Sequence, residues 1–151
     1  MRKPILIAAL ALMGAAGAAY AAEFSAAIVT QPASISSAFG PRANGLHSGA
    51  DVAAAAGAAV HAPASGRVLR VSAQGSMSGY GGQVVEIDHG EGVKTRFSNL
   101  EGVALTAGDA IGAGDIIGRI VANERPHVHV ELWRSGTLVD PATEMTLIAA
   151  D

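Results

Sequence analysis

The sequence predicts an all-β domain built on a twisted antiparallel sheet, and three observations lead to this prediction. Its 19 glycines and 6 prolines are spread along the chain and divide it into short segments. Several of these segments alternate apolar and polar residues, as strands with one buried face do. No stretch repeats apolar residues at helical spacing over the length of a helix. We expect about seven short strands, joined by turns, in a partly closed, barrel-like sandwich.

The predicted strands follow the turn signals along the chain. Residues 66–73 contribute Val68 and Val71 to the core, and residues 83–88 and 93–100 form a hairpin. The clearest alternation lies at residues 127–133, where every second residue is apolar. Further strands are predicted at residues 34–39, 116–120 and 137–139.

Two other segments are expected to be loops. Residues 53–59 are rich in alanine, and helix propensity alone favours a helix there. Gly57 and the shortness of the run favour a loop instead. Residues 74–82 form a loop rich in glycine and serine that contains Tyr80. Tyr80 is expected either to line a groove beside this loop or to pack on the neighbouring hairpin.

The first residues have the pattern of a signal peptide. Arg2 and Lys3 precede a short apolar run, and Ala19-Tyr20-Ala21 fits the small-x-small cleavage rule. The protein is therefore expected to be exported to a periplasm or to the outside, and to be free of the membrane after cleavage. An uncleaved anchor is the alternative. We divide the chain into a signal peptide (1–21), a linker (22–33), a folded domain (34–146) and a C-terminal tail (147–151).

Charge and composition exclude several classes of function. Without Arg2 and Lys3, the 10 basic residues of the chain fall to 8, against 13 acidic ones. No basic patch stands out, so neither nucleic acid nor an anionic membrane surface is an expected partner. The chain has no cysteine, which excludes disulfides, thiolate metal sites and a cysteine nucleophile. Packing, or a bound metal, must hold the domain together.

The predicted strand at residues 127–133 places polar side chains on one face. Side chains alternate in a strand, so His127, His129, Glu131 and Trp133 share one face, and the apolar residues between them face the core. Two imidazoles on one open face can bind one metal together, or one can bind the metal while the other acts on a substrate. The alternative is a polar strand face that is simply exposed to water.

A second cluster of polar residues begins at His47. If this segment is extended, His47, Gly49 and Asp51 project in the same direction, and Gly49 leaves room for an ion. Imidazole nitrogen and carboxylate oxygen are suitable zinc ligands. The alternative is a turn with an ordinary capping aspartate.

Together, the two clusters predict a metal site. His47, Asp51 and His129 supply three protein ligands and leave a fourth position for water, as a catalytic zinc requires. Glu131 would either orient a ligand imidazole from behind or be an ordinary solvated carboxylate.

At these motifs the chain resembles the lysostaphin-type, or LytM-type, zinc peptidases, the twenty-third metallopeptidase family. That family has His-x-Gly-x-Asp followed much later by His-x-His, in the order seen at residues 47–51 and 127–129. The resemblance extends over about residues 35–145 and includes further motifs, namely Phe39-Gly40-Pro41-Arg42, Ala62-Pro63-Ala64-Ser65-Gly66, Gly79-Tyr80-Gly81, Ile87-Asp88-His89-Gly90, Gly114-Asp115-Ile116-Ile117-Gly118 and Val139-Asp140-Pro141.

The resemblance implies a fold, a cofactor and a substrate. The fold would be the family's twisted antiparallel sheet, a duplicated hybrid motif, with the site in a groove. His47, Asp51 and His129 would bind zinc, and His127 would be a catalytic histidine beside the metal. Peptidoglycan peptides would be the substrates, and another cell-wall hydrolase or an activator would be a possible partner.

One residue departs from the family pattern. The family has Tyr-x-His-Leu on the strand after the hairpin, with a second catalytic histidine, whereas this chain has Phe97-Ser98-Asn99-Leu100. Asn99 cannot become cationic or transfer a proton at neutral pH, although it can donate a hydrogen bond. Loss of general acid–base help typically costs about 100- to 10,000-fold in rate.

The remaining candidates have simpler interpretations. His61 and His89 are expected to be structural or exposed, because no other ligand type pairs with them in the sequence. Arg42 is expected either to contact a substrate carboxylate or to be an ordinary surface arginine.

Three functions are consistent with these residues. The first is an active zinc endopeptidase that cuts peptidoglycan peptides. The second is a non-catalytic, zinc-bound module that binds peptidoglycan or regulates another cell-wall hydrolase, as Asn99 favours. The third is a carrier domain of the biotinyl or lipoyl type, but such domains need a lysine at a hairpin tip. Lys94, the only lysine after the signal, lies within a predicted strand.

Overall fold

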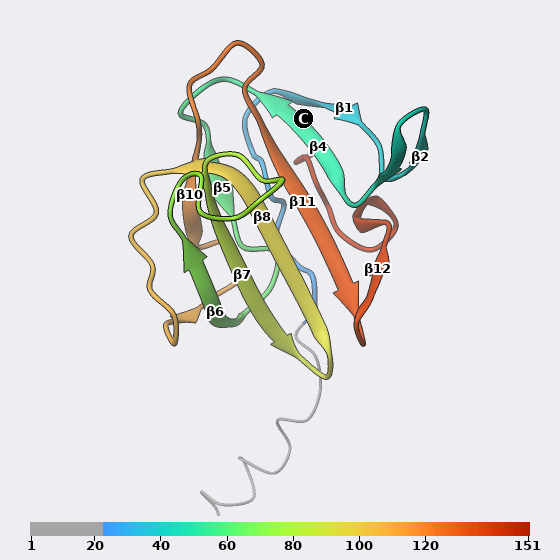
Figure 1. Ribbon diagram of the computed structural model, residues 1–151. Coiled ribbons are helices and arrows are strands. Elements are labelled where there is room, and N and C mark those ends of the chain that lie inside the picture. Colours follow the sequence, from blue (N-terminus) through green and yellow to red (C-terminus); the bar gives the residue numbers. More distant parts are fainter. Residues whose placement is uncertain (1–22) are drawn as a thin grey trace, which may run out of the picture.

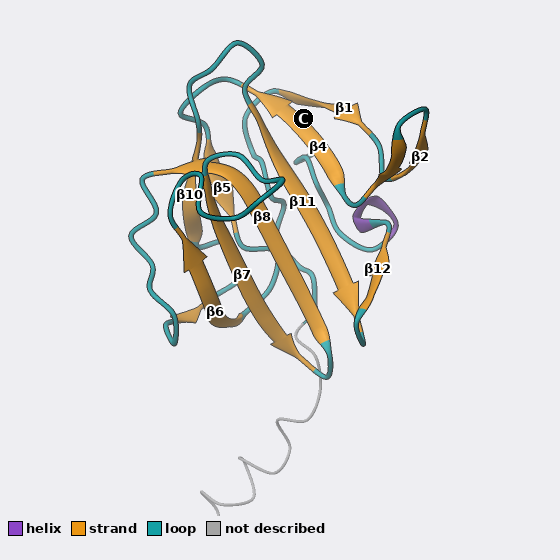
Figure 2. Ribbon diagram, in the orientation of Figure 1, coloured by secondary structure: helices purple, strands orange, loops and turns teal. Residues whose placement is uncertain are grey.

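Twelve strands and one turn of 3₁₀ helix make up residues 23–151, the part of the chain that the computed structural model describes (Figure 1; Figure 2). The all-β prediction is confirmed. The strands are β1 (Ala33–Ser37), β2 (Gly40–Arg42), β3 (Gly45–His47), β4 (Ala50–Ala54), β5 (Ala59–His61), β6 (Gly66–Ser72), β7 (Gln83–Gly90), β8 (Val93–Glu101), β9 (Ala110–Ile111), β10 (Ile116–Ile120), β11 (His127–Arg134) and β12 (Thr137–Val139), and the helix is η1 (Pro141–Thr143).

The main sheet is antiparallel throughout. Its strands follow the order β1-β4-β11-β8-β7-β6-β9, with β12 on β11 and with β10 joining β5 to β8. The sheet therefore stays open at β1 and β9 and does not close into a full barrel. Strands β2 and β3 form a separate two-stranded hairpin. Figure 1 shows β7, β8 and β11 side by side across the middle of the molecule.

Strand β11 separates the core from the polar face. Val128, Val130 and Leu132 are completely buried in the core cluster, as their alternation with polar residues predicts. Phe97 of β8, on the neighbouring strand, is the largest completely buried side chain. Strand β11 lies between β4 and β8, so residues of these two strands flank the polar side chains of β11.

Some local predictions are wrong. Ala53 and Ala54, expected in a loop, end strand β4, because both pair with β1 and Ala53 also pairs with β11. Val68 is in the core as predicted, whereas Val71 is only partly buried. The pairing of β6 with β7 shifts between Val68 and Arg70, which breaks the simple alternation.

Both ends of the described chain pack on the sheet. Ile28 and Val29, in the segment that the sequence assigns to a linker, are completely buried in the core cluster. The amide of Val29 donates to the carbonyl of Leu147, and Ala149 donates back to Val29. The predicted signal peptide, residues 1–21, lies outside the described residues. Within residues 23–151, no helix is long and apolar enough to cross a membrane.

Gly49 lies where the chain passes from β3 to β4. The sequence predicts that its missing side chain leaves room for an ion, but the open side of Gly49 faces strand β11 instead. A Cβ atom there would lie 2.1 Å from the carbonyl oxygen of Val130 and 3.0 Å from Cγ of Glu131. Glycine is needed at this position so that two backbones can approach closely, and the approach brings His47 and Asp51 against β11.

Replacing Gly49 should therefore destabilise the protein strongly. The added methyl group of Gly49→Ala meets backbone atoms that cannot rotate away, and we expect a loss of about 3 kcal/mol or more. Chemical denaturation followed by circular dichroism measures the loss. Gly102→Asn is the control, because Gly102 has a φ of 64° and open space around it, and asparagine tolerates that backbone conformation. Equal effects of the two substitutions would contradict the close approach.

Candidate functional site

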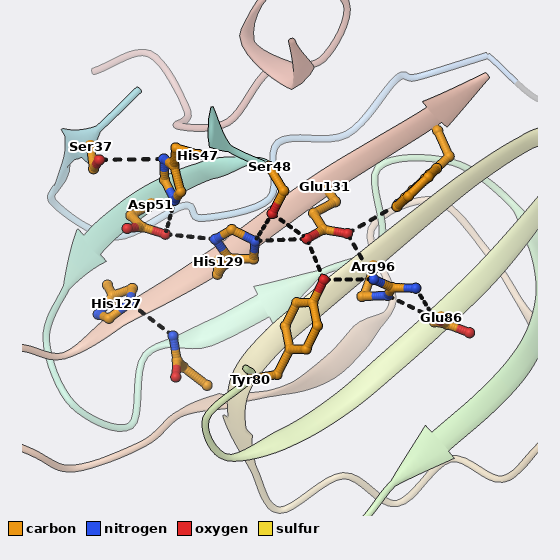
Figure 3. A network of polar contacts seen from close by, with 12 residues as sticks. Ser37, His47, Ser48, Asp51, Tyr80, Glu86, Arg96, His127, His129 and Glu131 are labelled. Atoms are coloured by element: carbon orange, nitrogen blue, oxygen red, sulfur yellow. Dashed lines mark hydrogen bonds and ion pairs between the residues drawn. The ribbon is translucent and has the colours of Figure 1, made fainter. Parts of the chain in front are cut away.

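Three strands bring His47, Asp51 and His129 together on the polar face of the sheet (Figure 3). Asp51 and His129 are direct cross-strand partners in β4 and β11, and His47 ends β3. One oxygen of Asp51, Oδ1, lies 3.3 Å from Nε2 of His47 and 2.8 Å from Nδ1 of His129. The three residues offer ligand atoms within 4.8 Å of one another, so they could hold a metal ion.

Hydrogen bonds on the far side of each imidazole orient the rings. Nδ1 of His47 lies 2.9 Å from the carbonyl oxygen of Ala38, to which it donates. Nε2 of His129 lies 3.1 Å from Oε1 of Glu131, to which it likewise donates. Nε2 of His47 and Nδ1 of His129 are therefore left facing Asp51, as two metal ligands would be.

Glu131 is a completely buried carboxylate held by several donors. The interpretation of Glu131 as a solvated carboxylate is wrong, because it lies behind His129 and beneath the loop that carries Tyr80. Its Oε1 accepts hydrogen bonds from Ser48 and Tyr80, each at 2.7 Å. Its Oε2 accepts hydrogen bonds from Arg96 and Trp133, each at 3.0 Å. Each oxygen is thus satisfied, as a buried charge requires.

Arg96 links this carboxylate to a second one. Its guanidinium donates to Glu86 through Nε at 2.7 Å and to the hydroxyl of Tyr80 through Nη1 at 2.7 Å. The guanidinium also lies over the rings of Tyr80 and Trp133, 5.1 and 5.5 Å from their centroids. Arg96 and Glu131 are direct cross-strand partners, so the sheet register itself places this ion pair.

The network changes the proton affinities of its members. Burial alone would lower the pKa of His129, but hydrogen bonds and charge interactions with Asp51 and Glu131 raise that pKa to about 9. Burial alone would raise the pKa of Glu131, but hydrogen bonds from His129, Ser48, Tyr80 and Trp133 lower it to about 2. Burial and the hydrogen bond to Glu131 raise the pKa of Tyr80, so its hydroxyl stays a neutral donor. In the metal-free chain, the contacts with Asp51 and Glu131 therefore favour the protonated ring of His129.

His127 and Asn99 form a pair beside the cluster. Nδ1 of His127 donates to the carbonyl of Arg125 at 2.7 Å, which leaves Nε2 as an acceptor. Nδ2 of Asn99 lies 2.8 Å from this Nε2, and an amide nitrogen can only donate. Asn99 thus orients the ring of His127.

The backbone at Asn99 explains how β8 presents this side chain. Asn99 has a φ of 62°, a conformation in which asparagine is enriched. The backbone N–H of Asn99 donates to the carbonyl of Gly81 at 2.8 Å, and the backbone carbonyl of Asn99 accepts from the N–H of Val121 at 3.0 Å. A Cβ atom on Gly81 would lie 2.4 Å from Oδ1 of Asn99. The glycine-rich loop therefore fits closely against Asn99.

The cluster and the pair lie together in a hollow of about 450 Å³. The β2–β3 hairpin contributes Leu46, which is 60% exposed, and the loop at residues 74–82 contributes Gly79, Tyr80 and Gly81. Tyr80 thus lines the groove, and its hydroxyl group also joins the hydrogen bonds between Glu131 and Arg96.

The structure brings together all five residues that the sequence assigns to the site, namely His47, Asp51, Asn99, His127 and His129. It places His61 and His89 elsewhere. His61 bonds to the carbonyl of Gly114, and the buried ring of His89 bonds to Ser65 and Thr95.

The sequence interpretation did not assign the contacts of Ser48, Arg96 and Trp133 with Glu131. Trp133 shares the strand face of Glu131, so its position was readable from the alternation. Arg96 reaches Glu131 from β8 and Ser48 reaches it from the link between β3 and β4, so only the folded sheet reveals them.

Comparisons with known proteins support the resemblance. The family model described as peptidase family M23 matches residues 45–141. A comparison with curated protein sequences finds no match.

Several solved structures share the fold. The catalytic domain of the prophage-encoded M23 protein EnpA from Enterococcus faecalis is 27% identical, with a TM-score of 0.64 over 78% of this chain and 95% of that one. Csd3 from Helicobacter pylori is 29% identical, with a TM-score of 0.64 over 86% of this chain and 36% of that one. A zinc containing peptidase from Vibrio cholerae is 24% identical, with a TM-score of 0.65 over 80% of this chain and 39% of that one. The chain thus spans less than half of the last two proteins.

The raised pKa of His129 predicts that the metal-free protein loses stability in alkaline solution. The pKa of His129 is about 9 in the folded protein and 6.5 in its usual state. The stabilisation by the protonated ring is therefore complete below pH 6.5 and is lost as the pH rises to about 9. The free energy of unfolding should fall by about 2–3 kcal/mol across this window. Thermal unfolding of chelator-treated protein at a series of pH values measures it.

Two substitutions separate this effect from other titrations. His129→Gln cannot gain a proton, so it should flatten the profile between pH 6.5 and 9. His61→Gln, outside the network, should keep the native profile. A profile that His129→Gln leaves unchanged would contradict the assignment of the charge to this ring.

Proposed function

This chain belongs to peptidase family M23, and from that premise we propose that it is an exported zinc metallopeptidase that hydrolyses peptide bonds in peptidoglycan. The observation that carries the proposal is the cluster of His47, Asp51 and His129 in an open hollow, with His127 beside it. Export is supported by the signal-peptide pattern of residues 1–21.

The residues present fit a zinc ion. Two imidazole nitrogens and one carboxylate oxygen form a common donor set of catalytic zinc, which leaves a position open to water or substrate. The hydrogen bonds from His47 to Ala38 and from His129 to Glu131 set the tautomers that such ligation needs. When bound, zinc supplies a Lewis acid that polarises a carbonyl group and lowers the pKa of water.

The protein's own residues would position and protonate the substrate. His127 is the residue proposed to move protons, because Nε2 of this ring is an acceptor at the edge of the cluster. Asn99 would hold the ring through its donated hydrogen bond but could not exchange a proton itself. Turnover is therefore expected to be slower than with two histidines, since general acid–base help is typically worth about 100- to 10,000-fold.

The groove also fits a peptide with small side chains near the scissile bond. Gly79 and Gly81 line one wall, and the exposed Leu46 offers an apolar contact on the other. This shape supports a peptide substrate with small side chains.

Zinc should bind once per chain and stabilise the fold. Binding to the folded state alone adds to the free energy of unfolding, so a chelator should lower the melting temperature. Metal analysis of the purified mature protein should give about one zinc per chain. His129→Ala should lose the metal, and the control His61→Ala should keep it. Full zinc content in His129→Ala would contradict the ligand assignment.

The catalytic pair should respond to two substitutions in opposite directions. His127→Ala should abolish hydrolysis, because Glu131, the other carboxylate in contact with the cluster within residues 23–151, is completely buried and occupied by its donors. Asn99→His should raise it, because imidazole carries charge and exchanges protons where the amide only donates. Peptidoglycan turnover, followed by the masses of released peptides, measures both, with zinc content checked in each variant.

The outcomes of this comparison separate the candidate functions. If the native protein is fully active and Asn99→His is slower, Asn99 is an adapted catalytic residue. That result would contradict the proposal that Asn99 lowers the rate of hydrolysis. Inactivity of all three proteins with zinc bound would contradict the peptidase proposal and favour a module that binds peptidoglycan without cutting it.

A further inference from the structure

A second hollow, of about 700 Å³, adjoins the groove on the side of edge strand β1. It shares Arg42, Asp51 and His127 with the groove, so the two form one continuous depression across the cluster. Its other lining residues are a second arginine, Arg125, and five small residues, namely Ser36, Ser37, Ala53, Ala54 and Pro126. A peptide that passes over the cluster would continue into this second hollow.

The two arginines of this hollow differ from the other arginines of residues 23–151. The side chains of the other five donate to a carboxylate or to a backbone carbonyl, namely Arg67, Arg70, Arg96, Arg119 and Arg134. Arg42 donates only to the hydroxyl of Ser37, at 3.3 Å, and the side chain of Arg125 has no hydrogen bond within the described chain. Neither forms an ion pair with a carboxylate of residues 23–151.

Arginines without a carboxylate partner are unexpected in an acidic chain. The whole sequence carries 13 acidic against 10 basic residues, so carboxylates are available to most cations. Asp51 is the one carboxylate that lines the second hollow, and it faces the two ligand imidazoles. The opposite part of the groove is lined by Leu46, Gly79 and Gly81, which carry no charge. Outside the cluster itself, the two arginines that line the depression therefore both lie in its second hollow.

We propose that Arg42 and Arg125 bind a carboxylate of the substrate peptide in this second hollow and so select peptides with a free carboxylate next to the scissile bond. The inference rests on the proposed function, because it takes the groove as the path of a peptide substrate. A guanidinium matches a carboxylate through paired N–H donors, and a peptide offers this group at its C-terminus or on acidic side chains.

Binding of two matched probes tests the inference without requiring hydrolysis. The probes are a peptidoglycan stem tetrapeptide with free carboxylates and the same peptide with its carboxylates amidated. Calorimetric titration uses zinc-loaded, full-length mature His127→Ala, in which cleavage is blocked. The free peptide should bind at least about fivefold more tightly than the amide, with a preference that weakens as salt is added.

Substitutions assign the preference to the two arginines. Arg42→Gln and Arg125→Gln, each added to the same background, should lower affinity for the free peptide about fivefold and leave the amidated peptide unaffected. Arg→Lys at either position should keep part of the preference, because the charge remains without the planar fork. Arg119→Gln, which removes a charge from β10 outside both hollows, should change nothing.

Each outcome decides for or against the subsite. Equal affinity for the two probes, no measurable binding of either, or equal losses for both probes in the glutamine variants would overturn it. A preference for the free peptide in a native protein that hydrolyses nothing would support the subsite while contradicting the peptidase proposal. Hydrolysis of both peptides by the native protein with equal kcat/KM would support the peptidase and overturn the subsite.

Discussion

The site depends on the buried carboxylate of Glu131. A completely buried charge is tolerated only when donors surround it, and Ser48, Tyr80, Arg96, His129 and Trp133 supply those donors from β8, β11 and two loops. Because Nε2 of His129 is one of the donors, the same carboxylate fixes which ring nitrogen faces Asp51. The hydrogen bonds that satisfy this buried charge therefore also orient a ring of the cluster that could hold a metal.

Much of this arrangement could be predicted from local patterns. Alternation placed Val128, Val130 and Leu132 in the core and the histidines on the other face, and the spacing of His47 and Asp51 pointed to one cluster. The contacts of Arg96 and Ser48 with Glu131 could not be predicted. Arg96 contacts Glu131 because of the register between β8 and β11, and Ser48 contacts it because the link between β3 and β4 passes over β11. Short strands such as β5 and β9 also escaped prediction, since their two or three residues are defined by pairing partners.

The groove combines a cluster that could hold a metal with the neighbouring pair of His127 and Asn99. His129 is held from both sides, whereas His127 is oriented by a neutral amide that cannot share its proton. Asn99 suits its left-handed backbone conformation and its close contact with Gly81, so the residue is well accommodated in the fold. In the proposed peptidase, proton transfer would rest on His127 alone, because Asn99 cannot exchange a proton.

Isotope labelling tests the central claim most directly. Purified peptidoglycan would be digested by the zinc-loaded mature protein in water enriched in ¹⁸O, and the released peptides would be analysed by mass spectrometry. Hydrolysis of a peptide bond places one solvent oxygen in each new carboxyl group, so the account predicts peptides that carry a single ¹⁸O at a new C-terminus. Release of no labelled peptide by protein with zinc in its site would contradict it.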